Sequence, residues 1–301
     1  MSNGSQTRYD YAIQPAYEAI PGPGDQWDKF RFNGGGPNRA TNTEEDPEIG
    51  GTAASVTAEA ASTGTMDVSL WYGQLDPFLE IIFGADFAGD VLTPGGLLRY
   101  FTLQESQPDL LAGDKFTQFI NGSVTSFQLT LPTPNGRITG QLGVSFSNGA
   151  SSAASIASAT PDENTSPVMR TGDLVTDLQI DDLPVASYNT RISQLVLNFT
   201  RETADEPQID VEGRGAISYG DLRCEIGITA YDENRTLVNT LFQNVSRKFE
   251  FSVRDVDGKG YDFLFPSATP NGGEVASPAK NTTRTQTLNY STSDIQITRV
   301  P

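Results

Sequence analysis

Hydrophobic and polar positions alternate most clearly over residues 123–146, on both sides of the turn-forming sequence PTPNG. A period of two predicts β-strands, because successive side chains of a strand point to opposite faces. Two such runs around a proline- and glycine-rich turn predict a β-hairpin. One face of this hairpin is apolar, and the other is polar and uncharged. The pattern by itself fits the solvent-facing sheet of an ordinary β-sandwich.

Shorter alternating runs predict strands along most of the chain, and two segments predict short helices. In the first helix, over residues 75–84, Asp76 is placed to cap the start, Pro77 fits the first turn and Gly84 ends it. The second helix is expected over residues 232–244. The other expected strands are residues 29–32, a pair within 53–72 that turns at 62–64, and 98–104, 115–120, 192–200, 215–219, 222–229, 248–253, 258–263 and 294–298.

Several segments are rich in turn-forming or small residues instead. Residues 1–27 are expected to be an N-terminal arm, residues 34–51 a long loop, and residues 148–172 a linker. A second acidic loop is expected after residue 200. Because long loops are commonly ordered by a neighbour, the acids of both loops are candidates for contacts between subunits or rings. These candidates are Glu44, Glu45, Asp46, Glu48, Glu202, Asp205 and Glu206.

The order hairpin, helix, strand, strand is expected twice, once on each side of the linker. The paired segments are residues 99–103 with 248–253, 113–119 with 258–263, and 127–130 with 294–298. This repetition predicts two similar domains, residues 28–147 and 173–301. Chance similarity between two β-rich segments is the alternative, because the paired segments share few identical residues.

The composition of the chain excludes several classes of function but says less about the fold. The 301 residues carry a formal net charge of -18 and contain no histidine. A protein that grips duplex DNA needs clustered Lys and Arg, so that class is disfavoured. Without histidine there is no imidazole metal site and no histidine-based catalytic triad. The lone Cys224 alternates with apolar residues and is interpreted as a buried strand residue. A signal-like N-terminus and a long apolar run are both missing, which predicts a protein kept in a reducing compartment.

Motifs for chemistry are weak. The sequence DVDGKG at residues 255–260 starts like a calcium loop, but Lys259 and Pro266 stand where ligands are needed, so it is interpreted as a hairpin turn. The chain lacks a phosphate-binding glycine loop and a Gly-x-Ser-x-Gly elbow. Trp27 and Trp71 are too few to indicate a sugar-binding platform. We therefore expect no catalytic residue, no metal and no cofactor.

Three passages, taken in order, resemble the tail tube proteins of long-tailed, siphovirus-type bacteriophages. They are LWYG to LEIIFG at residues 70–84, RYFTLQE with the following KF and FING at 99–122, and FQLTL with NGRITG at 127–140. In that family they form the hairpin, the flanking helix, the next strands and the sheet that lines the tube. The resemblance covers most of residues 30–146, and the second half follows more loosely.

The resemblance implies a mainly β fold with short flanking helices and two similar β-sandwich or half-barrel tube domains. Their sheets would close into a ring-shaped β-barrel when subunits associate, and the rings would stack. The chain would then be the major tail tube subunit, a structural virion protein and not an enzyme. With two tube domains per chain, a trimer gives a pseudo-sixfold ring, and a hexamer is the alternative.

Further implications concern partners and location. Besides itself, the subunit would contact a tape-measure protein inside the channel, and tail terminator and distal tail proteins at its ends. It would be assembled in the host bacterial cytoplasm, without a membrane, and DNA would pass through the lumen without specific binding. An acidic wall would repel DNA over roughly a Debye length, ~8 Å at physiological salt. The candidates for facing the lumen are Gln128, Thr130, Thr139, Gln141 and Ser145.

Two other functions remain open on the sequence. A carbohydrate-binding β-sandwich, acting as a virion decoration or adhesin, would use Trp71, Tyr72 and the acidic loops. A carboxylate-based hydrolase would need two acids that face each other across a cleft, and the sequence identifies no such pair.

Overall fold

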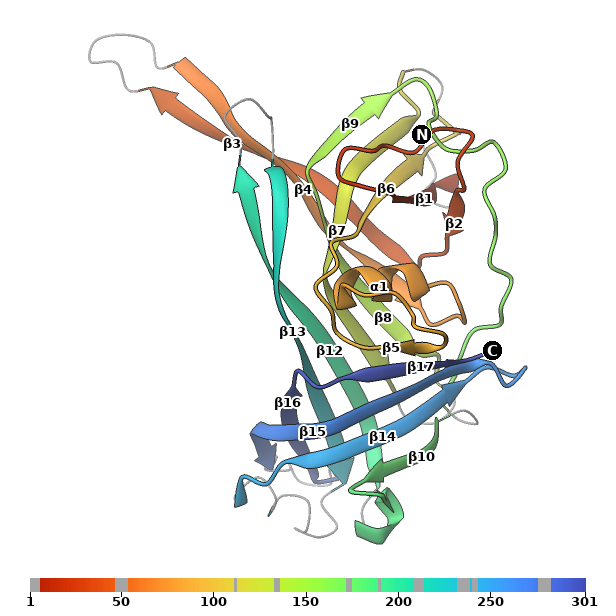
Figure 1. Ribbon diagram of the computed structural model, residues 1–301, viewed down its shortest axis with the longest axis vertical. Helices are drawn as coiled ribbons and strands as arrows, with labels where there is room; N and C mark the ends of the chain where they lie inside the picture. Colours follow the sequence, from red (N-terminus) through yellow and green to blue (C-terminus); the bar gives the residue numbers. More distant parts are fainter. Residues whose placement is uncertain are drawn as a thin grey trace.

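The computed structural model describes residues 6–46, 54–110, 113–132, 136–171, 175–188, 191–207, 214–231, 239, 243–275 and 283–301. Within these ranges the fold is mainly β, with seventeen strands in one hydrogen-bonded network and one α-helix. The ladders between named strands are all antiparallel. The chain therefore forms one open, strongly bent sheet (Figure 1).

The longest part of this network is a central sheet whose strands come from both halves of the chain. Its strands, in spatial order, are β3 (Gly34–Asp46), β4 (Ala54–Ser69), β8 (Thr139–Phe146), β7 (Phe116–Leu131), β12 (Ile192–Pro207), β13 (Arg214–Tyr231), β16 (Thr285–Thr292) and β15 (Gly260–Val275).

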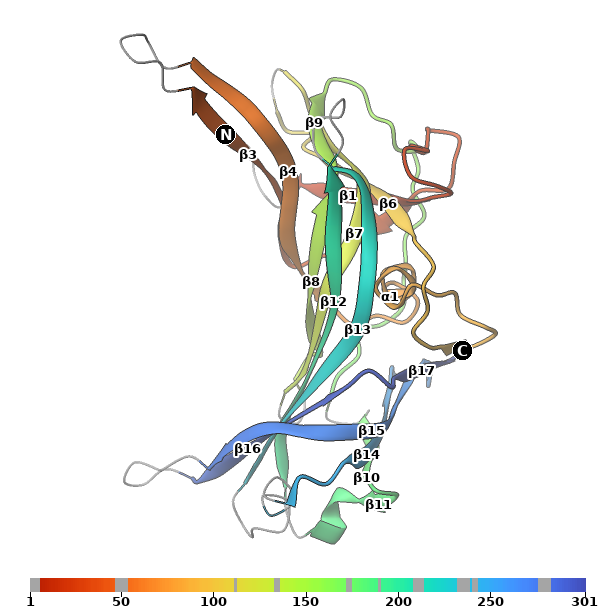
Figure 2. The same ribbon diagram turned by 60° about the vertical axis from the view of Figure 1, so that its left-hand side comes forward.

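Two smaller sheets pack on one side of the central sheet, with α1 (Asp76–Phe83) between them (Figure 2). The first contains β2 (Asp28–Phe30), β1 (Arg8–Gln14), β6 (Tyr100–Ser106), the start of β7, and β9 (Asn148–Ser152). The second contains β5 (Val91–Leu92), β17 (Gln296–Val300), the start of β15, β14 (Arg247–Arg254), β10 (Val175–Ile180) and β11 (Leu183–Pro184), which is followed by a 3-10 turn, Val185–Tyr188.

The long strands β7 and β15 each cross from a smaller sheet into the central one. The first half of β7 pairs with β6 and β9, and its second half pairs with β8 and β12. A register shift between Val124 and Ser126 marks the crossing, as expected for a β-bulge that bends a strand. One apolar core fills the space between the sheets and includes Phe78, Phe101 and Phe199.

Helix α1 confirms the expected element near residues 75–84, with one correction. Gly84 ends the helix in the left-handed conformation, with φ of 59°, as predicted. The N-cap is Leu75, and no side chain caps the helix. Asp76 instead accepts hydrogen bonds from the Tyr261 hydroxyl and from Arg299, at 3.1 Å, so it ties the helix to the C-terminal strands.

Several expected loops are strands. Residues 34–46 of the expected long loop form β3, and residues 202–207 of the second acidic loop continue β12. The expected hairpins within 53–72 and 215–229 are the single strands β4 and β13, and 115–131 is the single strand β7. These strands are long because each is paired over most of its length. The patterning was interrupted by Gly, Ser and Thr, and cross-strand pairing overrides their weak propensity.

Residues 1–27 and 148–172 contain more structure than an arm and a linker. Residues 8–14 form β1, which pairs with β6 and buries Tyr9 and Tyr11 in the core. The linker begins with β9, which pairs with β7. The expected helix 232–244 falls almost wholly outside the described residues, as do the turn residues 133–135 and Glu48.

The order of strand pairing in residues 8–152 recurs in residues 175–300. The pairs β1–β6, β3–β4, β4–β8, β6–β7, β7–β8 and β7–β9 are matched by β10–β14, β12–β13, β13–β16, β14–β15, β15–β16 and β15–β17. The counterpart of β17 is therefore β9, and the expected likeness of 294–298 to 127–130 is wrong.

Candidate functional site

The face of the central sheet that points away from the smaller sheets is polar along the described strands. On its other face, Phe127, Leu129 and Leu142 are buried in the core. Alternation therefore places the five candidate residues of the opening hairpin on the polar face, called here the outer face. Gln128 lies opposite Gln141, Thr130 opposite Thr139, and Ser145 opposite Ser123.

The outer face continues across β4, β12, β13 and β16. Gln141, which is exposed, donates a hydrogen bond to Asp67 of β4 at 3.0 Å. Asn198 of β12 lies opposite both Gln128 and Glu225. Side chains on this face are mainly amides and hydroxyls. The surface is therefore hydrated but offers few groups that bind a ligand tightly.

Charge on the outer face is predominantly negative. Asp67, Glu225 and Glu274 are exposed there, and Arg223 is an exposed cation on the same face. The alternation of residues 62–68 signals Asp67 as an outer-face residue, but the sequence interpretation did not use it. Polyanions would therefore be repelled by this surface rather than bound.

The two halves of the central sheet join along β7 and β12. Six consecutive residue pairs link Ser126–Leu131 to Leu195–Thr200, from Thr200 opposite Ser126 to Leu195 opposite Leu131. Phe127 and Phe199 stack on the core side at 6.1 Å between ring centroids. This ladder is called here the internal seam. In it, the edge strand β7 of the first half pairs with the edge strand β12 of the second half.

Arg201, which the sequence interpretation did not single out, ties the seam to helix α1. Its buried guanidinium donates to the carbonyls of Ile82 at 2.9 Å, Gly95 at 2.7 Å and Gly220 at 3.2 Å. It also lies 4.7 Å from the ring centroid of Tyr219. Burial lowers the pKa of Arg201 from its ordinary value, yet the carbonyls compensate for the lost hydration.

We expect Arg201→Met to lower the free energy of unfolding by about 2–4 kcal/mol, because buried carbonyls lose their donors while the stem volume is kept. Chemical denaturation of unassembled protein measures this. Arg223→Met, an exposed outer-face arginine on β13, is the matched control and should change stability by less than about 0.5 kcal/mol. Equal effects of the two substitutions would contradict a structural role for the Arg201 contacts.

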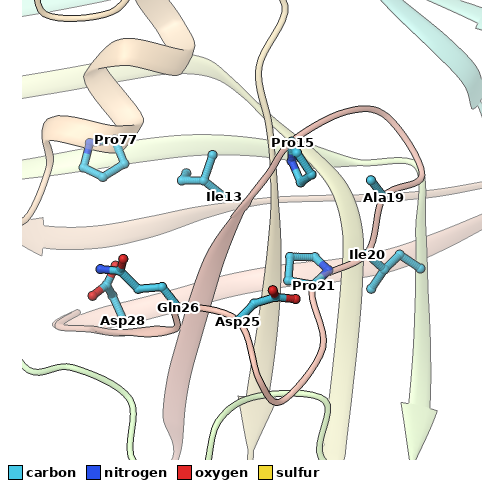
Figure 3. Close-up of a pocket in the computed structure, with 9 residues that line it drawn as sticks. All are labelled: Ile13, Pro15, Ala19, Ile20, Pro21, Asp25, Gln26, Asp28 and Pro77. Atoms are coloured by element: carbon cyan, nitrogen blue, oxygen red, sulfur yellow. The ribbon is translucent and has the colours of Figure 1, made fainter.

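A surface pocket of about 570 Å³ lies beside β1, between the N-terminal segment and the start of α1 (Figure 3). Its lining is mostly aliphatic and prolyl, and its acids are Asp25 and Asp28. Asp25 accepts a hydrogen bond from the Gly22 amide at 2.7 Å, which makes it part of a turn. Burial, and then the nearby Asp162, raise the pKa of Asp28. Neither a nucleophile with its base nor an oxyanion site is assembled by the residues that line this pocket.

The aromatic residues considered for sugar binding do not form an open platform. Trp27 and Trp71 are 2 % and 6 % exposed. The Arg31 guanidinium covers the Trp71 ring at 4.3 Å, and Tyr72 packs against Tyr261. A sugar ring needs a free aromatic face, so these residues do not support the carbohydrate-binding alternative.

Other candidates for chemistry are explained by local structure. Asp255 Oδ1 accepts hydrogen bonds from the amides of Asp257 and Lys259, which confirms the predicted hairpin turn between β14 and β15. Across the described ranges, no three Asp, Glu, His or Cys side chains gather as a metal site. Cys224 is buried in β13, as predicted, and burial raises the pKa of its thiol. None of the helices in these ranges has the length and apolar character to cross a bilayer.

The loop acids lie on strands where the structure describes them. Glu44, Glu45 and Asp46 belong to the end of β3, and Glu202, Asp205 and Glu206 belong to β12. Glu202 and Glu206 are exposed. The ends of β3 and β12 that carry these acids both lie toward the top of Figure 1.

Taken together, these features describe a β-rich fold whose central sheet has an extended polar face. The family model of the phage tail tube protein matches residues 4–292, so the chain belongs to the phage tail tube protein family. It is therefore a structural component of the virion tail that assembles with copies of itself into a tube. The comparison with curated protein sequences gave no match.

Proposed function

We propose that this chain is the major tail tube subunit of a long-tailed, siphovirus-type phage, and that three copies form one ring. Each chain would supply two tube domains, one of residues 28–147 together with β1 and β9, which pair with β6 and β7, and one of residues 173–301. The rings would stack into the tube. The central sheets would close into one β-barrel, since closure removes sheet edges that otherwise invite aggregation. The internal seam carries this proposal, because it is an edge-to-edge junction of the kind that a closed ring needs.

The outer face would line the channel. The smaller sheets and α1 cover the opposite face of the central sheet, so the outer face is the one left for a lumen (Figure 2). Duplex DNA carries one negative charge per ~1.7 Å of its axis and is held by counterion release to clustered cations. A wall with Asp67 and Glu225 exposed gives DNA little to bind, and the genome would slide through during ejection.

Partners other than the subunit itself follow from this role. A tape-measure protein would occupy the channel before ejection, and terminator and distal tail proteins would close the two ends. The hairpin ends that carry Glu44, Glu45, Glu202 and Glu206 would contact the neighbouring ring. Assembly would take place in the host cytoplasm.

Electron microscopy of the purified protein tests the proposal. We expect stacked rings or hollow tubes, and three chains per ring in cross-sections at modest resolution. Rings of six chains would overturn the trimer. Dispersed monomers under all solution conditions that support phage assembly, together with glycan binding, would overturn the tube role in favour of an adhesin.

A further inference from the structure

The pairing registers of the two halves coincide residue by residue. The register of the internal seam can therefore be transferred to the corresponding strands at the two ends of the central sheet. Leu103 opposite Phe119 is matched by Phe249 opposite Phe265, and Val124 opposite Val144 by Pro270 opposite Tyr290. Every one of these positions is offset by 146. The register shift that follows Val124 recurs after Pro270, so even the bulge is in the corresponding place.

The hairpin strands correspond through β8 and β16. Thr63 lies opposite Ser145, and Glu225 lies opposite Ser291, which is the counterpart of Ser145. Asn38 opposite Thr63 in β3–β4 is therefore matched by Asn198 opposite Glu225 in β12–β13. The strand β12 is thus the counterpart of β3, and the second half of β15 is the counterpart of the second half of β7. In the internal seam, Gln128 of β7 lies opposite Asn198 of β12. The corresponding residues are Glu274 on β15 and Asn38 on β3.

These two corresponding strands each have one edge that the described chain does not cover. Within the described residues, β3 pairs with β4 alone, and Thr269–Val275 pairs with β16 alone. They lie at opposite ends of the central sheet (Figure 1), so they do not complete each other within one chain. An uncovered strand of this length is a ready template for pairing with another chain.

We propose that the second half of β15 pairs antiparallel with β3 of the next copy of this chain, in the register of the internal seam, with Glu274 opposite Asn38. This inference rests on the proposed ring. In this register the amide of Asn38 can donate a hydrogen bond to the carboxylate of Glu274 across the junction. Both side chains lie on the outer face and are exposed in the isolated chain.

Cysteine cross-linking tests this register in assembled tubes. The variant Asn38→Cys/Glu274→Cys places one thiol on each side of the expected junction. Gln128→Cys/Asn198→Cys places the same pair at the internal seam and serves as the calibrating control, because those residues lie directly opposite within one chain. The shortest thiol reagent that joins the internal pair completely is then used for all variants. Native Cys224 is buried and stays unreactive.

We expect the Asn38→Cys/Glu274→Cys tubes to give covalent dimers and trimers on denaturing gels, at a yield close to that of the internal pair. Asn38→Cys/Thr269→Cys, displaced by several residues along β15, should give at least tenfold less. Tubes that form normally but cross-link no better than this displaced pair would overturn the register and leave the tube intact. A ladder that continues to six chains would support the register and overturn the ring of three.

Discussion

Replacing Leu129 with aspartate should abolish folding. Leu129 is 1 % exposed near the end of β7, opposite Gly140 of β8 and Leu197 of β12. Losing the buried side chain costs about 1.5–3 kcal/mol. A carboxylate placed there has no cation or donor among its cross-strand neighbours, and burying it unpaired costs more. Since domains are commonly stable by only about 5–15 kcal/mol, the variant should accumulate as insoluble chain.

The neighbouring substitution Gln128→Asp is the matched control, because it introduces the same side chain one residue away on the exposed outer face. It should yield soluble protein with the circular dichroism spectrum of the parent. Soluble yield and thermal melting compare the two variants. If Leu129→Asp melted cooperatively within a few degrees of the parent, the burial of this face of β7 would be disproved, and with it the assignment of the outer face.

Alternation in the sequence was sufficient to predict the opening hairpin, and its register confirms which residues share a face. Phe127 lies opposite Leu142 on the buried side, and Gln128 lies opposite Gln141 on the exposed side. The pattern predicted these faces because one side of the sheet is buried and the other is exposed to solvent along the whole hairpin. Gly84 likewise predicted the end of α1 through its left-handed conformation.

The strands that the sequence missed are those whose own residues give a weak strand signal and that are held by pairing with another strand. Residues 34–46 look like a loop because they are rich in Gly, Asn and Thr, yet β4 pairs with them at thirteen positions. Tyr9 and Tyr11 were assigned to an arm because prolines and glycines follow them, yet β6 holds that segment in the core. Local propensity carries no information about pairing with another strand, whether that strand follows directly, as β4 follows β3, or lies far along the chain, as β6 does from β1.

The outer-face charges show the same limitation for the site. Five uncharged residues were selected from one hairpin, whereas the acids Asp67, Glu225 and Glu274 come from three other strands. Only the strand order brings these acids onto one surface. Arg201 was missed for a related reason, since its carbonyl partners Ile82 and Gly95 lie more than a hundred residues away.

Reversing the charge of the outer face should slow DNA ejection strongly while leaving assembly intact. We expect the double variant Asp67→Lys/Glu225→Lys to fold, because both side chains are exposed to solvent on the outer face. Lysines in every ring would repeat along the whole tube and hold phosphates by counterion release. Phages carrying the variant should eject DNA at least tenfold more slowly at low salt, measured by dye uptake in single particles. A lysine placed at position 141 would be a weaker test, because it would lie beside Asp67 and be neutralised.

The salt dependence separates a lumen effect from a defect in assembly. Attraction between phosphates and lysines weakens as salt rises, so the variant should recover toward the parental rate at high salt, whereas a misassembled tube would not. Asp67→Asn/Glu225→Gln, which removes the charges without reversing them, should change the rate far less. Asp257→Lys, an exposed substitution in the β14–β15 turn away from the outer face, controls for added positive charge elsewhere. If the Asp257 variant slowed ejection as much as the double variant, or the double variant ejected at the parental rate in low salt, the outer face would not be the lining of the channel.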